Sequence, residues 1–100
     1  MVRANLTFKS IIEGGKSNPI RSGYRPNHSF EKLTGKNNIT FFIGEVQFNH
    51  HEFIYPGETS IVTVIFLKAG GVEQFLTPGR IWYVYESARL VAEGEILHLD

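Results

Sequence analysis

Apolar and polar positions alternate along this chain in several short runs. In residues 3–12, Ala4, Leu6 and Phe8 fall on one face, while polar side chains occupy the other. A period of two residues is typical of a half-buried strand. No window keeps helical periodicity over the roughly ten residues that a helix needs. The pattern therefore predicts an all-β protein that begins with a strand.

Five later segments also have strand character. They are residues 28–33, 37–48, 59–68, 80–86 and 89–99. Gly44 predicts a bulge or bend within its strand. The segment 59–68 is apolar at most positions, which predicts a central strand that is buried on both faces. Six or seven short strands separated by Pro-Gly turns favour a β-sandwich or a small barrel.

The connection between the first two predicted strands, residues 13–30, is too long for a hairpin turn and is basic. Residues 16–36 have a net charge of +4 and residues 37–100 a net charge of −5, although the whole chain is neutral. The cations are Lys16, Arg21, Arg25, Lys32 and Lys36. Such local asymmetry favours an anionic partner. A solvated loop kept soluble by its charge is the simpler interpretation.

Length and composition restrict the classes of protein. One hundred residues predict one domain, spanning residues 1–100. The absence of cysteine excludes disulfides, thiolate catalysis and cysteine-ligated metals, and it suits a reducing cytoplasm. The N-terminus lacks the apolar core of a signal peptide, and no apolar run reaches the roughly 20 residues that span a membrane. We therefore expect a cytoplasmic protein with no membrane partner.

The segment "EGGKSNPIRSGYRP" resembles the start of the C-terminal β-barrel, the third domain, of the bacterial translation elongation factor Tu. The matching positions are Glu13, Gly14, Gly15, Lys16, Pro19, Gly23, Tyr24, Arg25 and Pro26. Three later stretches resemble the same domain in the same order, at residues 56–58, 79–86 and 86–94. The resemblance therefore runs along nearly the whole chain.

The resemblance implies a six-stranded, antiparallel Greek-key β-barrel that stands here without its GTPase domain. In that family the third domain performs no chemistry, contacts the GTPase domain and holds the T-arm of aminoacyl-tRNA. The implied RNA or partner contacts are Lys16, Ser17, Asn18, Arg25, Asn27 and Arg89. The implied structural residues of the loop are Gly14, Gly15, Pro19, Gly23, Tyr24 and Pro26. We expect positive φ at Gly14 and Gly15, an anchoring role for Tyr24 and a structural ion pair for Arg25.

The chain departs from the family pattern in ways that bear on RNA and nucleotide binding. After Pro26 it has Asn27-His28-Ser29 where the family has glutamine and aromatic residues. Glu93 and Glu95 in the last predicted strand would repel phosphates. "EGGKS" ends like a phosphate-binding loop, but the upstream glycine of that motif is replaced by Ser10. We expect no bound nucleotide and no other cofactor.

Two other groups of residues are candidate sites. His50 and His51 are adjacent, and neighbouring residues on a strand point to opposite faces, so surface histidines in a turn are favoured over a shared metal site. Trp82, Tyr83 and Tyr85 favour core packing over a platform for stacking bases. No nucleophile with catalytic spacing is present, so we expect no enzymatic activity.

Two binding functions remain. The first is protein interaction through a barrel face or an exposed edge strand, with a separate translation-related factor as the expected partner. The alternative is binding of tRNA or structured RNA through residues 13–30 and Arg89. The neutral net charge favours protein interaction, because RNA affinity at physiological salt depends on cations.

Overall fold

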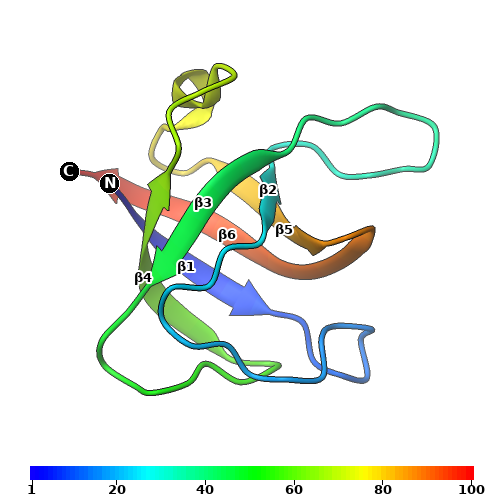
Figure 1. Cartoon of the computed structure of the whole chain (residues 1–100), viewed down its shortest axis with the longest axis vertical. Helices are drawn as coiled ribbons and strands as arrows, with labels where there is room; N and C mark the ends of the chain where they lie inside the picture. The colour runs from blue at the N-terminus through cyan, green and yellow to red at the C-terminus, as the bar shows by residue number, and fades with distance from the viewer.

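A computed structural model of residues 1–100 contains six strands and one short 3₁₀ helix. In chain order these are β1 (Val2–Phe8), β2 (Asn27–Ser29), β3 (Phe42–Gln47), β4 (Thr59–Phe66), η1 (Val72–Phe75), β5 (Ile81–Glu86) and β6 (Arg89–Leu99). All the strand pairs are antiparallel, and the sheet closes in the order β1-β4-β3-β2-β5-β6 (Figure 1). β5 returns to lie beside β2 after the β2–β3–β4 meander, which is Greek-key topology. The predicted antiparallel barrel is thus confirmed, and its closure leaves no free edge strand.

The segment between β2 and β3 was predicted to be largely strand, but most of it is a projecting loop. Figure 1 shows this connection extending away from the barrel. The Asn37 side chain organises the loop, because its Oδ1 accepts from the backbone N–H of Thr34 at 2.9 Å and its Nδ2 donates to the carbonyl of Lys32 at 3.1 Å. Such local side-chain bonds compete with a strand ladder.

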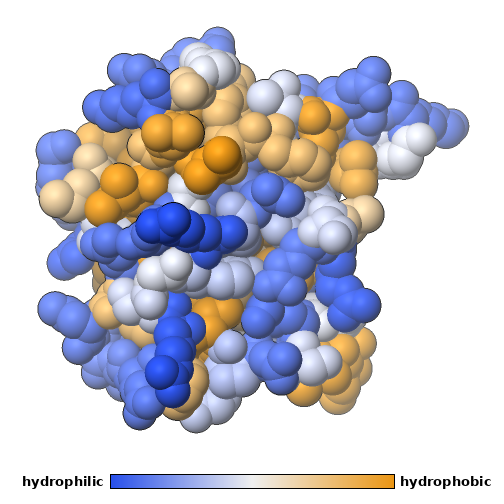
Figure 2. Space-filling model, viewed as in Figure 1, coloured by the Kyte–Doolittle hydropathy of each residue, from blue (hydrophilic) through white to orange (hydrophobic).

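The prediction that residues 59–68 are buried on both faces is wrong. Val62, Val64 and Phe66 point into the core, whereas Ile61, Ile65 and Leu67 are exposed. Each strand of a small closed barrel turns one face inward, and here no second layer covers the outer face of β4. Figure 2 shows hydrophobic residues gathered over the upper end of β3 and β4. The apolar outer positions of β4 are therefore surface.

Two glycines make room for large side chains in the core. A Cβ on Gly94 would lie 2.5 Å from the Trp82 ring, so the fully buried tryptophan depends on the bare backbone of β6. A Cβ on Gly44 would lie 3.0 Å from His28 Nε2. The β3–β4 register begins at Gly44 and has no shift, so of the predicted bulge or bend the bulge is absent. Both glycines serve close packing across the barrel.

The seam between β2 and β3 is closed partly by a side chain. Backbone pairing joins these strands only at Asn27–Ile43 and His28–Phe42. Beyond these pairs, His28 Nε2 donates to the carbonyl of Gly44 at 3.0 Å, and Trp82 Nε1 donates to His28 Nδ1 at 3.1 Å. The imidazole therefore links β2, β3 and β5 inside the barrel.

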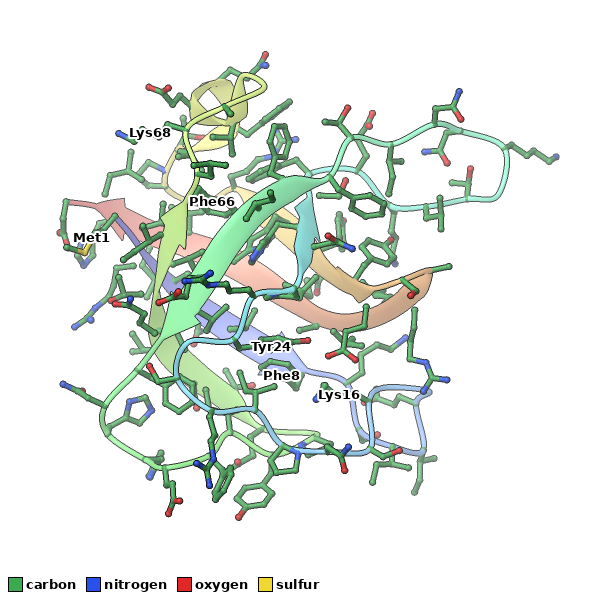
Figure 3. All side chains as sticks on the ribbon, viewed as in Figure 1. Met1, Phe8, Lys16, Tyr24, Phe66 and Lys68 are labelled. Atoms are coloured by element: carbon green, nitrogen blue, oxygen red, sulfur yellow. The ribbon has the colours of Figure 1, made fainter.

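Residues 9–26 wrap around one end of the barrel and are anchored by Tyr24. The Tyr24 ring packs against Phe8 with their centroids 6.2 Å apart, and its hydroxyl donates to Glu86 at the end of β5 (Figure 3). Gly14 has the expected positive φ of 88°, but Gly15 does not. A Cβ on Gly15 would lie 2.4 Å from the Lys9 carbonyl oxygen, so close approach of the backbone explains that glycine.

Candidate functional site

Four of the six implied contact residues lie around one pocket. Lys16, Ser17 and Asn18 form one wall, and the β5–β6 turn with Arg89 forms the other. Arg89 Nη1 donates to the carbonyl of Gly15 at 3.3 Å, which ties the turn to the loop. The fold therefore brings Lys16 and Arg89 together from opposite ends of the chain, without Asn27.

Lys16, one of the two cations of this pocket, already has partners. Lys16 Nζ lies 3.6 Å from Glu86 Oε2, donates to the Asn18 carbonyl at 2.9 Å and lies 5.5 Å from the centre of the Tyr24 ring. Its side chain is only 13% exposed. Burial, together with the hydrogen bond to Glu86, raises the pKa of Tyr24, so the phenol keeps its proton. An anionic ligand in this pocket would have to compete with Glu86 for Lys16.

Arg25 and Asn27 lie elsewhere, Arg25 just before β2 and Asn27 at its start. Arg25 Nε donates to Glu45 Oε1 at 2.7 Å, so the predicted ion pair forms, on a side chain that is 73% exposed. Hydrogen bonds from Gln47 and Arg25 lower the pKa of the Glu45 carboxyl. Asn27 is exposed and lies between Ile43 and Tyr85 in the sheet. These two candidates therefore do not join the Lys16 pocket.

Beside Arg25 lies a group of exposed aliphatic side chains, here called the apolar face, made of Ile43, Ile65 and Leu67. Their exposed fractions are 60%, 40% and 58%. The Leu67 N–H donates to the Ile43 carbonyl at 2.9 Å, and Ile65 lies opposite Glu45 in the β3–β4 ladder. The three side chains line one shallow groove whose polar rim includes Arg25, Glu45 and Lys68. The sequence carried the signal for this face, since residues 59–68 are apolar at outward positions too.

The basic stretch of the sequence is largely neutralised in space. Three of its five cations face carboxylates from the acidic part of the chain. The pairs are Lys16–Glu86 at 3.6 Å, Arg21–Glu52 at 3.4 Å and Arg25–Glu45 at 2.7 Å. The long loop therefore does not present a continuous cationic surface.

The aromatic group of β5 packs as the sequence predicted. Trp82 and Val84 are fully buried in the core. Tyr85 points outward but is covered by the β2–β3 loop, where its hydroxyl accepts from the Leu33 N–H at 2.9 Å. Lys32 lies 5.7 Å from the centre of the half-buried Tyr83 ring. The β5 tyrosines therefore do not form an open stacking platform.

The adjacent histidines lie in the β3–β4 connection rather than on a strand. The ring centroids of His50 and His51 are 4.6 Å apart, so the prediction that they point away from each other is wrong. No group of three or more histidine, cysteine or acidic side chains in the structure is placed to hold a metal ion. The structure also has no helix with the length and apolarity needed to cross a membrane.

Comparison with known proteins assigns no family to this chain. No protein-family model and no curated protein matches it. The function is therefore inferred from the barrel, the apolar face and the Lys16 pocket.

Proposed function

We propose that this chain is a non-enzymatic protein-interaction module, a barrel of the elongation factor Tu third-domain type, that docks its partner through the apolar face. The observation that carries the proposal is the uncovered cluster of Ile43, Ile65 and Leu67 on a single-layer barrel. Interfaces commonly place such apolar anchors at their centre and polar groups at their rim. Contiguous exposed apolar residues commonly mark interaction sites.

The charges at the rim favour a partner of particular chemistry. Arg25 is held by Glu45, whereas Lys68 is exposed and forms no ion pair. A complementary surface would place apolar side chains over Ile65 and Leu67 and a carboxylate opposite Lys68. Because the closed barrel has no free edge, such a partner docks by side-chain contacts rather than by adding a strand. The sequence resemblance supports a separate translation-related factor as this partner.

A photo-crosslinking residue at position 67 tests the docking surface directly. The protein captured from native lysate is identified, purified and titrated against the chain. We expect Ile65→Lys to weaken its binding at least about tenfold, because the change puts a charge in the apolar contact. Lys68→Glu should also weaken binding, because it reverses the charge at the rim. This loss should become smaller as salt is added, because salt screens exposed charges.

Ile12→Lys is the matched control. It makes the same substitution at an isoleucine that is 98% exposed and lies outside the apolar face. Equal losses from Ile65→Lys and Ile12→Lys, or no loss from either, would contradict the proposal. A concentration-dependent dimer that Ile65→Lys abolishes would show instead that the apolar face binds a second copy of the chain.

RNA binding is a second candidate because Lys16, Asn18 and Arg89 line one pocket. Backbone contacts of this kind recognise the shape and phosphates of structured RNA. If the pocket binds tRNA, Glu86→Gln should tighten binding by freeing Lys16, Arg89→Gln should weaken it, and Lys68→Gln should have little effect. Fluorescence anisotropy with bulk tRNA at two salt concentrations measures this. Binding that is insensitive to Arg89→Gln would end the RNA hypothesis.

A further inference from the structure

A hollow of about 790 Å³ lies beneath the β3–β4 connection, apart from the apolar face and the Lys16 pocket. Its floor is the outer surface of three neighbouring strands. The sheet register aligns Arg3 of β1, Thr63 of β4 and Gln47 of β3 in one row. His50 and His51 of the β3–β4 connection also line the hollow.

Most side chains that line this hollow are polar and can donate hydrogen bonds, and no carboxylate lines it. Arg3 Nη1 donates to Thr63 Oγ1 at 3.2 Å, and Arg3 takes part in no ion pair. The remaining lining includes the two imidazoles, the Asn49 amide, hydroxyls of serine and threonine, and Gln47, whose Nε2 already donates to Glu45 at 2.7 Å. A guanidinium without a carboxylate partner, beside neutral groups that can donate, is suited to an anion.

The wall that carries the histidines is tethered to the barrel. The Phe48 N–H donates to Ser22 Oγ at 2.9 Å. Ile20 and Ile54 exchange two backbone hydrogen bonds at 2.9 and 3.0 Å. The His50 ring packs against Phe48 with centroids 5.9 Å apart. These contacts restrict the histidine wall before any ligand arrives, which lowers the cost of ordering on binding.

We propose that this hollow binds a small oxyanion, the phosphate or sulfate group of a small molecule. Arg3 supplies the permanent cation and the two-pronged donor, and His50 and His51 donate from the opposite wall. Ile61 adds an apolar contact for the remainder of the ligand. This site is independent of protein docking at the apolar face.

Two carboxylates that flank the hollow in the sequence have cationic partners already. Glu45 is paired with Arg25, and Glu52 with Arg21. On β6, His98 lies opposite Arg3 and pairs with Asp100 at 3.2 Å. These carboxylates therefore do not pair with Arg3.

Sodium sulfate is the probe for this site, because it is an oxyanion with no further groups. Chemical shifts are followed by NMR while sodium chloride holds the ionic strength constant. We expect saturable shifts at the amides of His50, His51 and Thr63.

Three variants make the test specific. Arg3→Gln should weaken sulfate binding about tenfold, because one charge-assisted contact is lost. The double change His50→Ala and His51→Ala should also weaken it, because the donors of the histidine wall are lost. Lys68→Gln makes the same change of charge outside the hollow and should leave the affinity unaltered. Shifts that rise without saturation, or equal effects of Arg3→Gln and Lys68→Gln, would overturn the proposal.

Inorganic phosphate and glycerol phosphate at about pH 8 then separate two sources of the same chemistry. Saturable binding of either one at these amides supports the site. Tighter binding of the ester identifies a phosphorylated small molecule as the ligand class.

Discussion

His28 is a histidine with no exposed surface, held between two hydrogen bonds of opposite direction. Its Nδ1 accepts from Trp82 Nε1, so this nitrogen must be free of a proton, while Nε2 donates to Gly44. Burial lowers the pKa of His28 to about 4, and the hydrogen bond to Gly44 only partly opposes the shift. In a protonated His28, Nδ1 would also carry a hydrogen and would face the Trp82 N–H, so the hydrogen bond between them would be lost.

Stability should therefore fall in acid. A histidine in an unfolded chain titrates near pH 6.5, so the unfolded state binds more protons than the folded state between about pH 6.5 and about pH 4. The free energy of unfolding should decrease by about 3 kcal/mol as the pH falls through this window, and change little further from His28 below it. Urea denaturation at a series of pH values measures this. Equal acid slopes for the wild type and His28→Gln would contradict the assignment.

Single residues also show what the sequence could not reveal. A glycine inside a strand pattern indicates that position 44 has a structural role. The reason is the His28 side chain, which leaves no room there for a Cβ and comes from another strand. Gly94 likewise faces Trp82 across the β5–β6 ladder. A local pattern marks such positions but cannot name the side chain that fills the space.

At the scale of elements, the end of β5 holds the β1–β2 connection through Glu86. This carboxylate accepts from the Tyr24 hydroxyl and faces Lys16. Glu86→Gln keeps an acceptor for Tyr24 but removes the attraction to Lys16. The Glu86 side chain is 41% exposed, so solvent screening limits the expected loss of stability to less than about 1 kcal/mol.

Glu86→Leu should cost more, roughly 1–3 kcal/mol, because the half-buried Tyr24 hydroxyl then loses its partner. Thermal unfolding compares the two variants, and hydrogen exchange of residues 13–24 should accelerate more in the leucine variant. Arg25→Gln is the control from the same connection and should have little effect, since Arg25 is 73% exposed. If the glutamine and leucine variants behave alike, the hydrogen bond to Tyr24 is not what anchors the loop.

Elements differ in how far the sequence predicts them. The last strand, residues 89–99, has the predicted bounds, and the others are shorter than predicted. The prediction that residues 59–68 are buried on both faces failed for an identifiable reason. Apolar side chains on both faces of a strand indicate either a buried central strand or an uncovered outer face, and only the arrangement of the barrel distinguishes them.

In the whole molecule, the barrel is closed by strand pairs of very different length. β1 pairs along its length with β4 and β6, whereas β2 has three residues and pairs with β3 at only two positions. We expect amides of β1 and β6 to exchange with solvent only through global unfolding, and those at the β2–β3 seam to exchange through local opening as well. Native-state hydrogen exchange over a denaturant series measures this difference. Uniform opening energies for all six strands would contradict it.

The overall topology and the candidate surfaces were predictable to different extents. Strand patterns together with the family resemblance predicted an antiparallel Greek-key barrel. The resemblance grouped Lys16, Asn27 and Arg89, but only Lys16 and Arg89 line one pocket. The ion pairs that neutralise the loop were not predictable, because Glu45, Glu52 and Glu86 meet their cations only when the barrel closes.

Those ion pairs have a consequence for the unfinished chain. Residues 1–36 carry a net charge of +5, and the carboxylates that neutralise Lys16, Arg21 and Arg25 follow them in the sequence. Because these carboxylates come later in the sequence, residues 1–36 lack them until the acidic part has been synthesised and the barrel has closed. Barrel closure is therefore also the step that neutralises this cationic segment.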